Sequence, residues 1–261
     1  MVRLGIGLAL AFACFGCGDP QKEYGERINA GNSASDARDF SCAIKAYDSA
    51  IALDPKKAEA FDSRGMAHSE NGDCDRAIRD FDEAIRLDPN RAATFNNRGL
   101  VHSMLGEYDA AIRDFDSALR LNGAQSAVFV NRGMAYAQGK KDYARALRDF
   151  DEAIRLDPRR ALVYSNRGLA KLALKDPEGA IEDLNEAIRL GPKLALAWNN
   201  RGLARASLKD YDGAISDYDA ALKLDAGYAN AFQNRGTALK AKGDLARAEQ
   251  DFAEARRLAG R

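Results

Sequence analysis

Arginine and aspartate recur together along this chain in a pattern that could form ion pairs. Each of six arginines stands directly before a glycine, and an aspartate follows it by 16 or 17 residues. The first copy of the pattern has neither charge, with Ala30 and Ala46 in their places. We therefore predict a charge-assisted pair that links the helices of one repeat or of adjacent repeats. The couples are Arg64 and Asp80, Arg98 and Asp114, Arg132 and Asp149, Arg167 and Asp183, Arg201 and Asp217, and Arg235 and Asp251.

The same six arginines could instead form a ladder that binds an anionic ligand. A buried charge needs a partner, and a carboxylate beside each arginine would neutralise it. We therefore favour the structural pair over the anion ladder.

An asparagine stands directly before five of these arginines. An amide is both donor and acceptor, so a column of asparagines can hold a peptide backbone without reading its side chains. Buried amides also need partners whatever the function, so the column could equally tie neighbouring helices together. The five are Asn97, Asn131, Asn166, Asn200 and Asn234, with Ser63 in the earlier copy.

An apolar residue follows the glycine in five successive copies. Such a column predicts the apolar floor of a groove, suited to an extended or helical segment of a partner. The residues are Met66, Leu100, Met134, Leu169 and Leu203.

The spacing of seven glycines indicates which elements position these side chains. Self-similarity at this period is typical of repeat arrays, whose units pack only on their neighbours and enclose no deep catalytic pocket. Five intervals are of 34 residues and one of 35, between Gly31, Gly65, Gly99, Gly133, Gly168, Gly202 and Gly236.

Residues 58–91 illustrate one unit. The first helix is expected to stop near Asn71-Gly72, where glycine can adopt a helix-ending conformation. Asp73 then begins a second helix, whose apolar residues recur at intervals of three and four, and Asp88-Pro89 ends it. An acid that can cap the second helix occurs in all seven units, at Asp39, Asp73, Glu107, Asp142, Asp176, Asp210 and Asp244.

The pattern of these units resembles the tetratricopeptide repeat. An aromatic residue, a glycine four positions later, an alanine twelve beyond it and then aromatic, alanine and proline positions carry the resemblance. It implies an all-α solenoid of seven helix-turn-helix repeats forming a right-handed superhelix over residues 24–261. The asparagine column resembles the ladder that binds extended peptides in the O-linked N-acetylglucosamine transferase array. The expected units are 24–57, 58–91, 92–125, 126–160, 161–194, 195–228 and 229–261.

Residues 1–17 lie outside the repeats and resemble a bacterial lipoprotein signal. A basic Arg3 precedes a 12-residue run of apolar residues and glycine, which suits a signal sequence and is too short to span a bilayer. We expect lipidation at Cys17, with Cys14 as the alternative, followed by a linker over 18–23. Ordinary cleavage after residue 13 would instead release a soluble periplasmic protein.

Composition and the remaining motifs argue against other classes of function. Lys plus Arg and Asp plus Glu are equal at 39 each, so nucleic acid is not an expected partner. His68 and His102 are interpreted as substitutes for a packing aromatic, and Asp-x-Asp patterns such as residues 80–82 as solvated helix faces. Cys42 and Cys74 are interpreted as buried free thiols, with a disulfide between them in an oxidising compartment as the alternative. We expect neither a cofactor nor catalysis.

The last unit has charges at two positions where earlier units have Ile or Leu, at Glu249 and Arg256. Such changes are typical of a capping repeat, so we expect the array to end here. The sequence as a whole predicts an exported, lipid-anchored envelope protein that faces the periplasm and binds a partner protein or peptide. The alternative is a regulatory or substrate-presenting subunit of an envelope enzyme or of a secretion or assembly complex.

Overall fold

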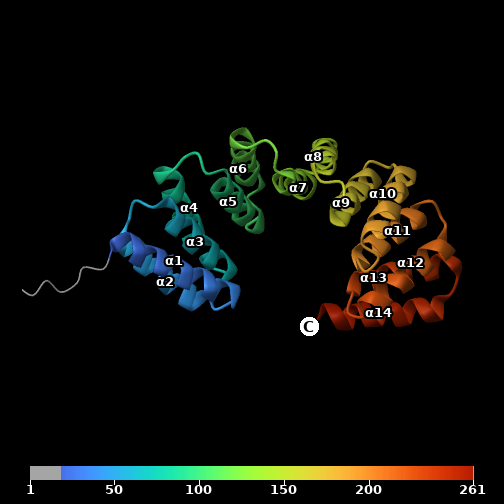
Figure 1. Cartoon of the computed structure of the whole chain (residues 1–261). Coiled ribbons are helices and arrows are strands. Elements are labelled where there is room, and N and C mark those ends of the chain that lie inside the picture. Colours follow the sequence, from blue (N-terminus) through green and yellow to red (C-terminus); the bar gives the residue numbers. More distant parts are fainter. Residues whose placement is uncertain (1–18, 261) are drawn as a thin grey trace, which may run out of the picture. The chain divides into compact units, whose positions relative to one another are not determined.

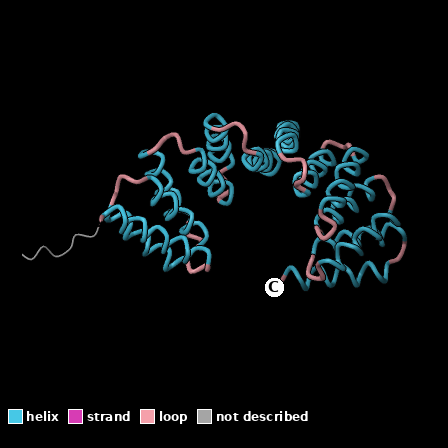
Figure 2. The backbone as a smooth tube through the Cα atoms, viewed as in Figure 1, coloured by secondary structure: helices cyan, strands magenta, loops and turns pink. Residues whose placement is uncertain are grey.

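The computed structural model describes residues 19–260 and consists of helices joined by short turns (Figures 1 and 2). No strand occurs in this part of the chain. The elements are α1 (Pro20–Asp36), α2 (Phe40–Leu53), α3 (Ala58–Glu70), α4 (Cys74–Leu87), α5 (Ala92–Met104), α6 (Tyr108–Leu121), α7 (Ser126–Ala135), the π-helical turn η1 (Tyr136–Lys140), α8 (Tyr143–Leu156), α9 (Ala161–Ala173), α10 (Pro177–Leu190), α11 (Ala195–Ser207), α12 (Tyr211–Leu224), α13 (Ala229–Lys242) and α14 (Leu245–Ala259).

The chain divides into two compact units, residues 1–89 and residues 90–261. In the first unit, α1 pairs with α2, and α3 pairs with α4. In the second unit, the pairs are α5 with α6, α7 with α8, α9 with α10, α11 with α12, and α13 with α14. Each pair is one helix-turn-helix repeat, and we call its members the first and the second helix.

The glycine that sets the repeat period lets the two helices of a pair approach closely. A Cβ added at Gly65 would lie 2.8 Å from the Phe81 ring on the second helix, and one at Gly202 would lie 2.6 Å from the Tyr218 ring. Both distances are shorter than real Cβ contacts. The ring of the second helix therefore occupies the space that a side chain on the first would need.

Small residues complete this packing along the second helices. Ala77 and Ala84 on α4 are fully buried, as are Ala111 and Ala118 on α6. Each repeat contributes such alanines to a core shared with its neighbours inside the same unit. Burial of many small side chains between close helices is what the repeat pattern predicts.

The turn between the two helices of a repeat contains one residue in the left-handed region. Glycine holds this position in three repeats, with φ between +76° and +89°. Arg38, Lys141, Lys175 and Lys209 hold it in the other four, with φ between +51° and +64°. A side chain with a Cβ is disfavoured there by about 1–2 kcal/mol.

Acids at the start of the second helices act as caps in six of the seven repeats. The Asp73 carboxylate, for example, accepts from the Arg76 backbone N–H at 3.1 Å. Glu107 makes no such bond at the start of α6. Its carboxylate instead contacts His102 Nδ1 at 2.7 Å.

Candidate functional site

The six arginines lie on first helices and reach the second helix of the same repeat. Arg132 binds Asp149 with two parallel bonds, Nε to Oδ2 at 3.0 Å and Nη2 to Oδ1 at 2.6 Å. Arg64 binds Asp80 in the same manner, at 2.8 and 2.6 Å. The same geometry recurs in Arg98 with Asp114, Arg167 with Asp183, Arg201 with Asp217 and Arg235 with Asp251.

A second oxygen acceptor comes from the preceding repeat. Arg132 Nη1 donates to Asp116 at 2.6 Å, and Arg64 Nη1 donates to Asp48 at 2.6 Å. The corresponding partners are Asp151 for Arg167, Asn185 for Arg201 and Asp219 for Arg235. The interpretation of the Asp-x-Asp patterns as solvated faces is therefore wrong. In residues 149–151, for example, Asp149 is buried and Asp151 accepts from Arg167 of the next repeat.

These contacts leave the arginines with little capacity for an anionic ligand. The hydrogen bond to Asp80, assisted by Asp48, outweighs burial and holds the pKa of the Arg64 guanidinium above its usual range. The guanidinium also lies over the Phe61 ring, 5.5 Å from its centre. Each arginine thus joins the two helices of its repeat. Five of them are also shown bonded to the preceding repeat of the same unit, namely Arg64, Arg132, Arg167, Arg201 and Arg235.

The histidine positions take part in the same charge clusters. His68 is buried with Nε2 3.9 Å from Asp80 Oδ2, and His102 Nε2 lies 3.9 Å from Asp114 Oδ2. Later repeats place Lys171 beside Asp183 and Arg205 beside Asp217, both at 2.9 Å. The position therefore supplies a polar neighbour to the aspartate, which the interpretation as a packing aromatic missed.

Three of the five ladder asparagines donate an amide N–H to a side chain of the preceding repeat. Asn131 donates to Asn96 at 2.9 Å, Asn200 to Ser165 at 3.1 Å and Asn234 to Asn199 at 2.9 Å. Asn200 is only 2% exposed. These three residues tie first helices together, whereas the Nδ2 atom of Asn166 is buried without a hydrogen-bond partner. Asn97 lies half-buried on α5.

The apolar residues of the expected groove floor are partly open to solvent. In the first unit Met66 is 49% exposed, and in the second unit Leu100 is 38% exposed. Met134, Leu169 and Leu203 are half-buried on α7, α9 and α11. We call the surface that carries these residues and the ladder asparagines the first-helix face of each unit.

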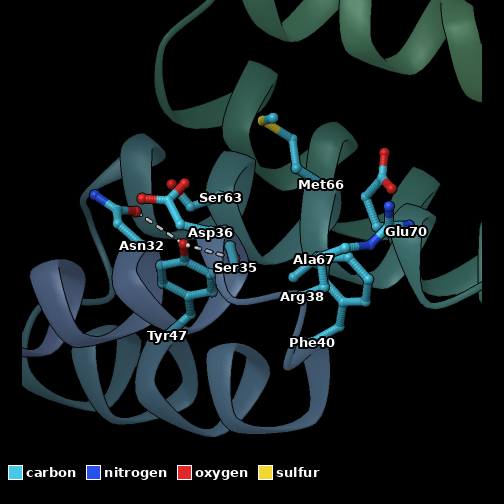
Figure 3. Close-up of a pocket in the computed structure, with 10 residues that line it drawn as sticks. All are labelled: Asn32, Ser35, Asp36, Arg38, Phe40, Tyr47, Ser63, Met66, Ala67 and Glu70. Atoms are coloured by element: carbon cyan, nitrogen blue, oxygen red, sulfur yellow. Dashed lines mark hydrogen bonds between the residues drawn. The ribbon is translucent and has the colours of Figure 1, made fainter.

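A pocket of about 590 Å³ lies on this face in the first unit, between α1, α2 and α3 (Figure 3). The Tyr47 hydroxyl donates to Asn32 Oδ1 at 2.8 Å and lies 3.4 Å from Ser35 Oγ. The pocket's lining mixes apolar and polar side chains and includes two carboxylates. Its residues are Asn32, Ser35, Asp36, Arg38, Phe40, Tyr47, Ser63, Met66, Ala67 and Glu70.

A second pocket, of about 370 Å³, lies at the equivalent place in the second unit, between α7, η1, α8 and α9. It has no carboxylate in its lining and is more apolar. Its residues are Met134, Ala137, Gln138, Lys141, Tyr143, Phe150, Asn166, Leu169, Ala170 and Ala173. Sequence reasoning named Met134, Asn166 and Leu169 but missed the others, although the single 35-residue interval marks this repeat as different.

The prediction of two buried free thiols is correct for their free state and wrong for their burial. Cys42 and Cys74 are both free, but Cys42 is exposed and Cys74 is only partly buried. The signal sequence with Cys14 and Cys17 lies outside the described residues. Within residues 19–260, no helix is both long and apolar enough to cross a membrane, and no group of His, Cys, Asp or Glu could hold a metal ion.

Paired helices, a glycine at each close approach and an acid at the start of each second helix define this protein as a helical repeat protein. The family model for the tetratricopeptide repeat matches residues 28–92, 63–127, 96–161, 131–195 and 166–229. The chain belongs to the tetratricopeptide repeat family. The fold of this family is that of a scaffold for protein–protein interaction. No curated protein matches the chain in sequence.

Solved structures share this fold at low sequence identity. A tetratricopeptide repeat protein from Parabacteroides merdae is 19% identical, with a TM-score of 0.75 over 91% of this chain and 93% of that one. PilW, described as a type IV pilus biogenesis factor, is 17% identical, with a TM-score of 0.70 over 76% and 91%. YrrB, described as having an unusual peptide-binding site, is 25% identical, with a TM-score of 0.53 over 68% and 91%.

Proposed function

We propose that this protein is a non-catalytic scaffold of the bacterial cell envelope that holds a segment of a partner protein on its first-helix face. The observation that carries the proposal is the pair of pockets at equivalent positions in the two units, both open beside partly exposed methionine or leucine side chains. Pockets of about 300–1,000 Å³ suit side chains or small ligands. The same face would serve if the protein presents a partner to an envelope enzyme or to an assembly complex.

The arginines play no part in this recognition, since their charges are engaged within the array. Recognition therefore depends on apolar contacts and on the hydrogen bonds of polar groups that line the two pockets. Extended segments suit such a face, because their backbone groups are free to pair with side-chain amides.

Selection of a displayed random peptide library on the full chain tests the binding proposal. Leu100→Glu and Leu169→Glu each place a charge on the first-helix face. We expect at least one of them to weaken the binding of selected peptides about tenfold or more, since burial of a leucine is worth about 1.5–3 kcal/mol. Leu224→Glu is the matched control, because Leu224 is 43% exposed at the end of a second helix. Equal binding by all three variants and the wild type would contradict the proposal.

The envelope assignment rests on residues 1–17 and has its own test. Cells that express the full chain are labelled with radioactive palmitate, and the label is expected on the wild type and absent from a Cys14/Cys17 double variant. Absence of label from the wild type would refute the lipid anchor. Export without an anchor would then appear as unlabelled protein in the periplasmic fraction.

A further inference from the structure

The fourth repeat contains one residue more than the others, and the structure shows where it lies. In the second repeat the Asp73 N–H bonds the carbonyl five residues earlier, His68, at 2.9 Å. In the fourth repeat the Asp142 N–H bonds the carbonyl six residues earlier, Tyr136, at 3.0 Å. The added residue is therefore absorbed in the π-helical turn η1, an element that is rare and often found at functional sites.

A close contact supports this turn from the preceding repeat. A Cβ built at Gly139, inside η1, would collide with the ring of Tyr108 at the start of α6. Lys140 also reaches back to Asp109, with Nζ 2.5 Å from Oδ2. The π-helical turn is thus packed against α6 rather than loose.

The ladder partner of Asn166 is missing in the same repeat. Asn131, Asn200 and Asn234 each donate to the residue that directly precedes the ladder asparagine one repeat earlier. For Asn166 that residue is Val130, whose side chain has no acceptor. The Asn166 Nδ2 atom is left buried without a partner, a state that costs about 1–3 kcal/mol.

The pocket beside Asn166 differs in chemistry from its equivalent in the first unit. Met134 stands where the first unit has Asn32, and Ala173 stands where it has Glu70. The charged residue that remains is Lys141, which is exposed and has no carboxylate within ion-pair distance among the described residues. The pocket in the second unit therefore combines an apolar cavity, one unpartnered amide N–H and one unpaired cation.

We propose that this pocket is a subsite for one large apolar side chain of an extended partner segment that carries an acidic residue beside it. The Asn166 N–H binds a backbone carbonyl of the segment, and Lys141 faces its acid. An extended segment fits better than a helix, because the carbonyls inside a helix are already bonded to its own N–H groups. The inference rests on the proposed function and names the chemistry of the partner at this site.

The test uses the full chain and the peptides that it selects from a displayed random library. We expect the selected sequences to share a leucine, methionine or phenylalanine with Asp or Glu within two positions. Asn166→Leu should weaken the binding of these peptides about 3- to 10-fold, which is the contribution of one hydrogen bond. It should not lower the stability of the free protein, since the amide N–H has no partner to lose. Lys141→Gln should remove the preference for the acidic neighbour.

The matched control is Asn200→Leu, which removes a buried amide that does have a partner. This variant should lower the stability of the free protein, whereas Asn166→Leu should not. That difference would show that the two asparagines differ in whether their amides have partners. Selected peptides that bind the Asn166→Leu variant as well as the wild type, or that bind as helices, would overturn the inference and leave the proposed function standing. Self-association of the chain that blocks the selected peptides would also overturn it. Failure to select any peptide would refute both.

Discussion

Replacement of Asp149 by alanine tests whether the arginine–aspartate pairs stabilise the repeat array. Asp149 is 4% exposed and accepts both parallel bonds from Arg132, whereas Asp116, the partner from the preceding repeat, has a side chain 37% exposed. Removal of one member of a fully buried ion pair costs about 3–5 kcal/mol, because the other charge is left buried. Arg132 keeps Asp116 and is itself 21% exposed at its side chain. We therefore expect Asp149→Ala to lower the free energy of unfolding by about 2–3 kcal/mol.

Equilibrium unfolding in urea, followed by circular dichroism, measures this loss. With a slope of about 1–3 kcal/mol per molar, the midpoint should fall by about 1 M. Asp116→Ala is the matched control, with an expected loss of about 0–1 kcal/mol, as for an exposed ion pair. Hydrogen exchange should place the effect of Asp149→Ala in α7 and α8.

A third variant separates the loss of a pair from the burial of a lone charge. Replacement of both Arg132 and Asp149 by leucine leaves no uncompensated buried charge, because Asp116, which also loses its partner, has a side chain 37% exposed. The double variant should therefore destabilise less than Asp149→Ala alone. Equal losses of unfolding free energy in Asp149→Ala and Asp116→Ala would refute the reasoning. So would a double variant whose loss equals the sum of the losses of the two single leucine variants.

Three further changes have outcomes that urea unfolding can measure. Ala118→Leu should overpack the fully buried contact of α6 and cost about 1–3 kcal/mol, whereas the same change at exposed Ala93 should have little effect. Lys209→Gly should raise stability by about 1 kcal/mol, since φ there is +63°, and a loss would contradict the strain argument. Burial holds the pKa of His68 below its ordinary value of about 6.5, so the unfolded chain binds the proton more readily. Stability should therefore fall as pH drops below about 7, and His68→Gln should reduce that dependence.

Much of the fold could be predicted because its signals are local and repeated. The acid that starts each second helix, the proline that ends several of them and the glycine at each close approach recur in copy after copy. Comparison of the copies also indicated the partner of each arginine, because Arg64 and Asp80 have counterparts in five other repeats and neither has one in the first. The second partner, such as Asp116 for Arg132, was missed because it belongs to the neighbouring repeat.

The sequence by itself determined the repeat period, the helices and the pairing of charges within a repeat, since each depends on the spacing of residues along one chain. Only the tertiary structure decided which ladder amides have partners. That outcome depends on contacts across repeats, where Ser165 offers Asn200 an oxygen and Val130 offers Asn166 none. The 35-residue interval was visible in the sequence, but its consequence was not. The added residue is accommodated by a π-helical turn in which Gly139 leaves room for the ring of Tyr108, and this turn lines the apolar pocket beside Asn166.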